Sequence, residues 1–96
     1  MNKSDLVDSI SEETTISKKD VTRMLDSFLR IVARTLKKGH KVSIAGFGSF
    51  NISRRAERRG INPATKERID LPAVTVPRFK AGKYLRDLVR SVKFGN

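Results

Sequence analysis

Residues 53–74 read SRRAERRGINPATKERIDLPAV, and this stretch decides how the rest of the chain is organised. It holds few large apolar side chains before Asn62-Pro63, a dipeptide that is a strong turn signal. The pattern predicts two strands joined at a tip, and a hairpin standing alone is marginally stable in water. We therefore expect an arm that extends from a folded body and becomes ordered on a ligand.

Two helices are predicted before the arm. The first has Asn2 or Ser4 as its N-cap and ends in the polar stretch 12–15. The second begins after the N-cap Ser17 and ends before Gly39. Its apolar side chains recur at helical spacing in one wide stripe, at Val21, Met24, Leu25, Phe28, Leu29, Val32 and Leu36.

A period of two predicts the strands that flank the arm. A first strand surrounds residues 42–44, Gly46-Phe47-Gly48 forms a tight turn, and a second strand leads into the arm. The returning strand is interrupted at Pro72, because proline cannot donate to a ladder. A short helix near residues 82–92 follows it. The alternating apolar positions are Val42 and Ile44, Phe50 and Ile52, Ile69 and Leu71, and Val74 and Val76.

Basic residues concentrate in the second half of this chain of 96 residues, whose net charge is +11. Residues 1–50 hold nine Lys and Arg against six Asp and Glu, and residues 51–96 hold twelve against four. Arg outnumbers Lys eight to four in the second half, and Arg suits bidentate phosphate contacts. A charge run is more often a solvated face, but this one favours a polyanionic partner such as DNA, RNA or an anionic membrane.

Several function classes find no support in the residues. The absence of Cys excludes disulfides and thiolate metal sites, and His40, the only His, falls in a predicted turn. Gly46-Phe47-Gly48 lacks the third glycine of a dinucleotide loop, and the carboxylates show no metal-ligand spacing. We expect no enzyme, no metal and no cofactor. No apolar run approaches the ~20 residues of a membrane span, and the N-terminus lacks a signal peptide.

The size of the chain predicts a dimer. Without the arm, roughly 70 residues remain, a length at which a single core is marginal. The stripe on the second helix is wider than the short strands and helices can cover. Association of two subunits through this helix and the sheet is the simplest way to bury it.

Three segments together resemble the HU/IHF family of bacterial histone-like DNA-bending proteins, and HU most closely. The resemblance covers about residues 1–92, with the motifs in matching order and spacing. The segments are Gly46-Phe47-Gly48-Ser49-Phe50, Arg58-Arg59-Gly60-Ile61-Asn62-Pro63-Ala64-Thr65 and Val76-Pro77-Arg78-Phe79-Lys80-Ala81-Gly82-Lys83.

The resemblance implies an α+β fold and an intertwined dimer with an α-helical body, a β-sheet saddle and two extended β-ribbon arms, the IHF-like DNA-binding fold. The chain would be one HU-like domain over residues 1–96. About 1–52 would form the helical body and the start of the sheet, about 53–76 the DNA-binding arm, and about 77–96 the end of the sheet and the C-terminal helix.

The resemblance also implies site residues. Pro63 would be the wedge that enters between base pairs, although an Asn-Pro pair alone marks an ordinary turn. Asn62 would flank the wedge and reach a base edge. The other expected DNA contacts are Lys3, Gly46, Gly48, Arg54, Arg55, Arg58, Arg59, Ile61, Lys66, Arg68, Lys80, Lys83 and Arg86. The expected dimer core is Phe28, Leu29, Val32, Leu36, Ile44, Phe47, Phe50 and Phe79.

The chain departs from the family pattern near the tip. Ile61 stands where the family often has Arg or Lys, and could add apolar surface beside Pro63. Lys66-Glu67 replaces the usual Gly-Lys, so a turn that needs a positive φ is less comfortable and we expect a different tip. Asp70 adds a negative charge to the returning strand, which Arg59 offsets in part.

The function implied is that of an architectural protein that binds and bends double-stranded DNA through the minor groove with little sequence specificity, and compacts or organises the chromosome. Bent, nicked or flexible DNA would be preferred, since it costs less to kink. The expected assembly is a homodimer, cytoplasmic and associated with the nucleoid, with no membrane partner and no small-molecule substrate. Two alternatives stay open: a sequence-preferring IHF-like factor and a basic RNA-binding protein.

Overall fold

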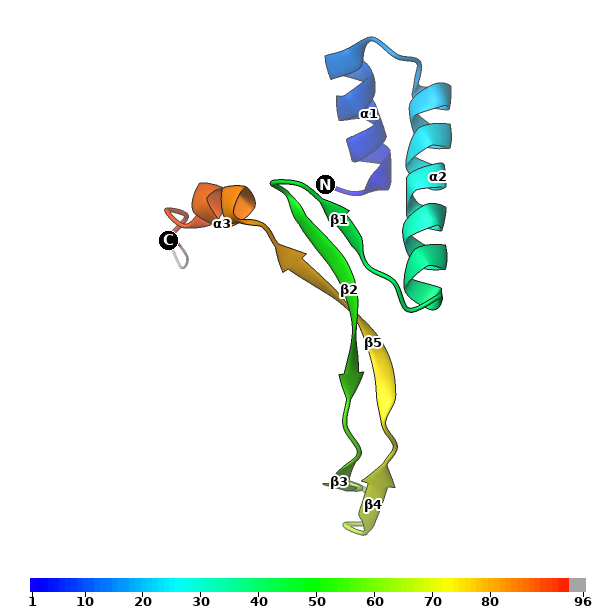
Figure 1. The fold of residues 1–96 in the computed structure, drawn as a ribbon, viewed down its shortest axis with the longest axis vertical. Helices are drawn as coiled ribbons and strands as arrows, with labels where there is room; N and C mark the ends of the chain where they lie inside the picture. Colours follow the sequence, from blue (N-terminus) through cyan, green and yellow to red (C-terminus); the bar gives the residue numbers. More distant parts are fainter. Residues whose placement is uncertain (94–96) are drawn as a thin grey trace. The chain divides into compact units, whose positions relative to one another are not determined.

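The structure, a computed structural model, describes residues 1–93, without the side chain of Arg58. The chain divides into two compact units, Met1–Thr35 and Leu36–Asn96. Figure 1 shows the helices and strands in chain order along the ribbon. The elements of each unit follow from its own sequence pattern.

The first unit is a helical hairpin. Helix α1 spans Lys3–Thr14 and is capped by Asn2, whose Oδ1 accepts a 2.9 Å hydrogen bond from the N–H of Asp5. The Asp5 carboxylate accepts one from the Asn2 N–H at 3.1 Å, which completes a capping box. The structure therefore selects Asn2 over Ser4 as the cap. The helix ends at Thr15, whose φ of 60° is left-handed.

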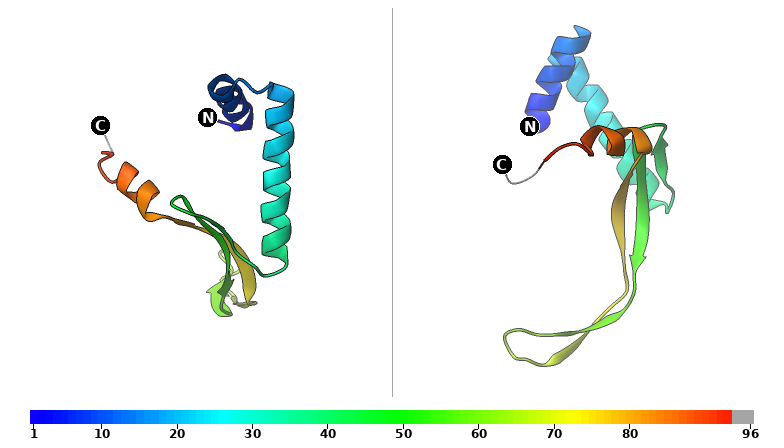
Figure 2. Two further views of the ribbon diagram at one scale, coloured as in Figure 1. Left: turned by 45° about the horizontal axis from the view of Figure 1, so that its top comes forward. Right: turned by 90° about the vertical axis from the view of Figure 1, so that its left-hand side faces the viewer.

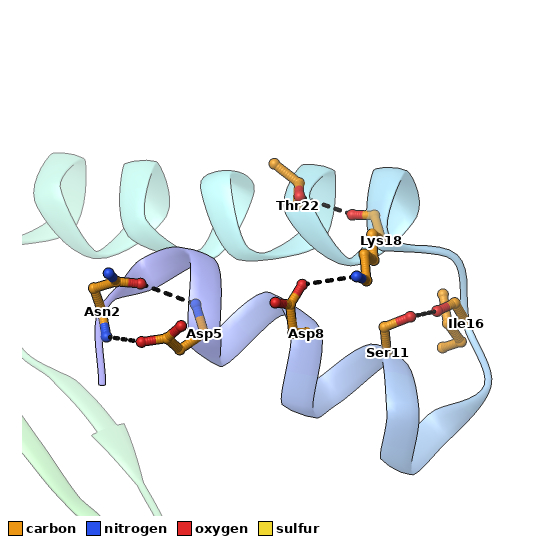
Figure 3. Close-up of polar contacts among 7 residues, drawn as sticks. All are labelled: Asn2, Asp5, Asp8, Ser11, Ile16, Lys18 and Thr22. Carbon is orange, nitrogen blue, oxygen red and sulfur yellow. Dashed lines mark hydrogen bonds and ion pairs between the residues drawn. The ribbon is translucent and has the colours of Figure 1, made fainter.

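Helix α2 spans Lys18–Lys37, and its last two residues belong to the second unit. Ser17 caps it as predicted, since its Oγ accepts a hydrogen bond from the Asp20 N–H. Figure 3 shows α1 beside α2, with the Lys18 ammonium 3.1 Å from an Asp8 carboxylate oxygen. A second ion pair joins Lys3 to Asp26. Together, the two pairs show that α1 and α2 run antiparallel.

The apolar stripe of α2 is only partly buried. Val7, Val21 and Val32 are the buried hydrophobic residues among those described. Met24 and Leu29 expose about half of their surface, 51% and 49%. Burying such side chains contributes about 25 cal/mol per Å². A single chain leaves this contribution unused, as the size argument anticipated.

The second unit contains a three-stranded antiparallel sheet, ordered β1-β2-β5. Its strands are β1 (Val42–Ile44), β2 (Gly48–Arg55) and β5 (Val74–Ala81). The ladder between β2 and β5 runs unbroken from Gly48↔Ala81 to Arg55↔Val74. The predicted strands are confirmed, and the register places segments about 20 to 30 residues apart in sequence directly side by side.

A second, two-stranded sheet forms the hairpin of β3 (Arg58–Ile61) and β4 (Arg68–Leu71). Pro72 lies in the break between β4 and β5, as predicted. We call residues 56–73, between the end of β2 and the start of β5, the arm hairpin. The right-hand view of Figure 2 shows that this ribbon continues from β2 and β5 and curves toward its tip.

Helix α3 (Lys83–Val89) follows β5 and begins after Gly82. It is shorter than the predicted 82–92. The chain leaves the helix in a turn, in which the Val92 N–H donates to the Val89 carbonyl at 3.0 Å, an i→i+3 bond.

Three phenylalanines pack against each other on the sheet. The ring of Phe79 lies 5.1 Å from that of Phe50 and 5.7 Å from that of Phe47, centroid to centroid, and both pairs are tilted. Gly48 permits this packing. A Cβ at Gly48 would lie 2.5 Å from the Lys80 carbonyl oxygen and 2.7 Å from a ring carbon of Phe79.

We predict that Gly48→Ala lowers the free energy of unfolding by about 2 kcal/mol, because the added methyl group overpacks the sheet. Denaturant unfolding followed by circular dichroism measures the loss. Gly46→Ala is the matched control: its φ is +81°, but its Cβ meets nothing within 4 Å. It should cost only the left-handed strain of about 1 kcal/mol. Equal losses in the two variants would contradict crowding as the cause.

Candidate nucleic-acid interface

The tip of the arm hairpin, Asn62–Glu67, is a hydrogen-bonded turn. The Asn62 N–H donates to the Glu67 carbonyl at 2.8 Å, and the Lys66 N–H donates to the Asn62 carbonyl at 2.6 Å. The side chain of Asn62 takes part, since its Oδ1 accepts the Ala64 N–H at 2.9 Å. Pro63 follows Asn62 at the position where its fixed φ suits a turn, and its ring is exposed.

This arrangement changes what Asn62 offers a ligand. Its Oδ1 is engaged in the turn, so a contact with a base edge would come from the Nδ2 donor. The sequence could place Asn62 at the tip but could not show which half of its amide the turn uses.

Lys66 adopts a left-handed conformation with a φ of 59°. A positive φ is therefore present here without a glycine, and a different tip stays a prediction. The bonds between Asn62, Lys66 and Glu67 hold the turn closed. Lys66 pays a conformational cost of about 1 kcal/mol relative to glycine for this conformation.

The register gives the arm hairpin two unlike faces. Directly opposite residues share a face, and successive pairs alternate. Gly60 pairs with Ile69, and the side chains of Ile69 and Leu71 lie over Gly60, 3.7 and 3.4 Å from the position of a Cβ. The other face carries the pairs Arg59↔Asp70 and Ile61↔Arg68.

Arg59 and Asp70 form a long ion pair, 3.9 Å from Nε to Oδ1. Their side chains are 81% and 86% exposed, so the pair adds little to stability. The pair affects the electrostatic field of the arm, because the Asp70 carboxylate and the Arg59 guanidinium offset each other in part, as the sequence predicted. A phosphate can replace Asp70 as the partner of Arg59. Arg54 and Arg55 end β2 exposed, just before the arm hairpin.

A second cluster lies where the Gly46–Gly48 turn meets the end of β5. Gly46, Gly48, Lys80 and Arg86, four predicted site residues, line one open hollow of about 300 Å³. The Gly82 N–H donates to the Phe47 carbonyl at 2.7 Å and ties the start of α3 to the turn. The hollow combines two basic side chains with glycine backbone, a combination that fits a phosphate.

Helix α3 extends this basic surface. Lys83, Arg86, Asp87 and Arg90 line a shallow groove of about 280 Å³, and the Lys83 ammonium lies 2.7 Å from the Asp87 carboxylate. The sequence prediction included Lys83 and Arg86 but missed Arg90. The spacing of Arg90, four residues after Arg86 and seven after Lys83, could have identified it.

Lys3 and Arg58 are the remaining basic residues of the predicted site. Lys3 lies in the first unit and is paired with Asp26. The side chain of Arg58 lies outside the described part of the chain, although its backbone belongs to β3. Within residues 1–93 there is no cluster of three or more metal-ligating side chains. The described helices include none with the length and hydropathy to span a membrane.

Comparison with known proteins identifies the family. A family model described as bacterial DNA-binding protein matches residues 1–90. A DNA-binding protein HU of Geobacillus stearothermophilus is 43% identical over 90 residues, covering 94% of this chain and 100% of that protein. The chain belongs to the bacterial DNA-binding protein family.

Solved structures of this family agree with the fold. The structure of an Anabaena HU–DNA cocrystal is similar with a TM-score of 0.91 and 40% identity, covering 95% of this chain and 99% of that one. HU from Thermotoga maritima is similar with a TM-score of 0.66 and 34% identity, covering 93% and 98%. The resemblance inferred from the three sequence segments, and the α+β fold that it implied, are confirmed.

In this family member we predict that Lys66→Gly tightens the arm tip, because glycine adopts a positive φ without the Cβ penalty. Removing about 1 kcal/mol of backbone strain corresponds to about fivefold slower hydrogen exchange at the Asn62 amide, whose hydrogen bond closes the turn. Nuclear magnetic resonance measures this rate. Ala64→Gly, in the same turn, is the control and should not slow exchange. An unchanged rate in Lys66→Gly would refute the strain.

Proposed function

We propose that this chain is an architectural protein, not an enzyme, which binds and bends double-stranded DNA with little sequence specificity and compacts the chromosome. The observation that carries the proposal is an arm hairpin with no core of its own, rich in exposed Arg and closed by an exposed proline, in a chain of the bacterial DNA-binding family. The neighbouring HU of Anabaena is described as a cocrystal with DNA.

The arm hairpin supplies affinity by charge. Arg59, Lys66 and Arg68 are exposed along it, and Arg54 and Arg55 are exposed directly before it. Contacts of such groups with phosphates release counterions, which favours binding at low salt. The arm follows the minor groove. Because these contacts are made to the backbone of DNA, they carry little sequence information.

Pro63 is the wedge of this proposal. A rigid apolar ring at an exposed tip can enter between two base pairs and unstack them, at a cost of a few kcal/mol. The bend that results lets more DNA contact the protein, which offsets that cost. The closed turn from Asn62 to Glu67 supports this role, because it holds the ring in one position.

Basic groups away from the arm hold the DNA beyond the kink. The hollow of Gly46, Gly48, Lys80 and Arg86 offers a place for one phosphate. Lys83 on α3 and Arg90, which directly follows the helix, line one groove with Arg86 and continue the contact. In the first unit, Lys3 is a further expected contact, for which a phosphate would replace Asp26 as its partner.

The unit that binds DNA is a homodimer. Within it, we assign the exposed stripe of α2 and the phenylalanine cluster of the sheet to the buried core, which consists of Phe28, Leu29, Val32, Leu36, Ile44, Phe47, Phe50 and Phe79. The 44% exposure of Phe47 and of Phe79 in one chain supports this assignment. Residues 1–96 then act as one DNA-binding domain, located in the cytoplasm and associated with the nucleoid.

A mobility-shift titration tests the function. The probes are an intact DNA duplex, the same duplex with one nick, and an RNA duplex of equal length. We expect the nicked DNA to bind tightest, since a nick lowers the cost of the kink. Affinity should fall about 10³-fold or more between about 50 and 200 mM salt. Equal binding of all three would reduce the protein to a general polyanion binder, and preference for RNA would overturn the proposal.

We predict that Pro63→Ala reduces the bend angle much more than the affinity, because the wedge acts after the arm has docked through its charges. Fluorescence transfer between dyes at the two ends of a DNA duplex measures the bend. Ala64→Gly changes the neighbouring residue and leaves the ring in place, so it should keep the bend. A Pro63→Ala variant that bends DNA as the unchanged protein does would remove Pro63 from its role.

A further inference from the structure

Ile61 is an exposed apolar side chain in a charged setting. It is the last residue of β3 and lies directly before the tip. Its exposure is 66%, compared with 39% for Ile69 on the opposite strand. A large β-branched side chain left in water contributes little to the stability of the hairpin, so it is available to a ligand.

The register places Ile61 on the face of the arm hairpin that carries the charged pair. It pairs with Arg68, and the pair Arg59↔Asp70 lies next on the same face. Ile69 and Leu71 occupy the other face, where they cover Gly60. Of the three large apolar residues of the hairpin, Ile69 and Leu71 therefore pack over Gly60, and Ile61 does not.

The neighbouring tip decides what Ile61 meets. Ile61 lies two residues before Pro63, the proposed wedge, so it reaches the minor groove beside the kink when the wedge enters. Arg68 opposite it and Arg59 two residues before it contact phosphates, so Ile61 meets the floor and walls of the groove. It has neither a charge to reach a phosphate nor a hydrogen-bonding group to reach a base.

An apolar side chain on the groove floor can distinguish base pairs by the groups that they present there. A·T pairs present only the acceptors of adenine N3 and thymine O2 in the minor groove, whereas G·C pairs add the guanine 2-amino group. That group projects into the groove and would be buried against Ile61 without an acceptor. Burying a donor without a partner is unfavourable.

We propose that Ile61 is a specificity-determining residue that favours pairs without a minor-groove amino group beside the kink. The inference rests on the proposed function, since it requires the arm to lie in the minor groove. Little specificity overall is compatible with it, because the preference covers only the pairs that Ile61 touches.

Modified bases isolate the amino group from the rest of the sequence. Four nicked DNA duplexes differ only in the pairs beside the nick: A·T, G·C, inosine·C and 2,6-diaminopurine·T. Inosine·C is G·C without the 2-amino group, and diaminopurine·T is A·T with it. We expect A·T and inosine·C to bind about fivefold more tightly than G·C and diaminopurine·T.

Variants assign the preference to the residue. Ile61→Ala should remove the difference between the four duplexes. Ile61 is exposed, so its truncation leaves no cavity, and circular dichroism checks the fold. Ile69→Ala, on the opposite face, is the matched control and should keep the difference.

Each other outcome has a distinct meaning. A preference that persists in Ile61→Ala would come from DNA deformability and would overturn the inference. Equal binding of the four duplexes by the unchanged protein would overturn it as well, while the bending function would stand. Failure to bind any of the four duplexes would refute the proposed function itself.

Discussion

The antiparallel ladder between β2 and β5 is the constraint on which the second unit depends. It pairs eight residues of each strand without a break, from Gly48 to Arg55 and from Val74 to Ala81. One end of the ladder brings the Gly46–Gly48 turn against Lys80 and the start of α3. The arm hairpin continues from the other end of the ladder, at Arg55 and Val74. A shift of one residue would reverse the face of every side chain in both regions.

The same ladder explains why the arm can exist without a core. The hairpin beyond Arg55 and Val74 buries little apolar surface, apart from Ile69 and Leu71 over Gly60. Its strands stay aligned because the ladder before them fixes their start and the bonded turn at Asn62–Glu67 fixes their end. Repulsion between its Arg side chains opposes this alignment, and bound phosphates would relieve it.

Sequence reasoning found the elements because their signals are local. The stripe of α2, the cap at Ser17 and the break at Pro72 each depend on residues close together in the chain. It was less informative about the tip and the end of the last helix. Lys66 has a left-handed φ although it is not glycine, because the Asn62–Glu67 and Lys66–Asn62 hydrogen bonds close the turn around it. Helix propensity carried no sign that α3 stops at Val89. For the site, the basic residues of the arm stay predictions, and Arg90, which lines a groove with Lys83 and Arg86, was not among the predicted contacts.

By itself, the sequence determined the helices, the strands and the Arg-rich arm, and that a single chain holds more apolar surface than it can bury. The α+β fold class followed from the resemblance of three segments to a known family. Periodicity and charge are properties of the order of residues, so they can be read without coordinates. Only the tertiary structure decided which residues share a face: that Ile61 lies with Arg59 and Arg68, and that Gly46 and Gly48 meet Lys80 and Arg86. These groupings depend on the register between strands, which is set by pairing across the sheet and not by neighbours along the chain.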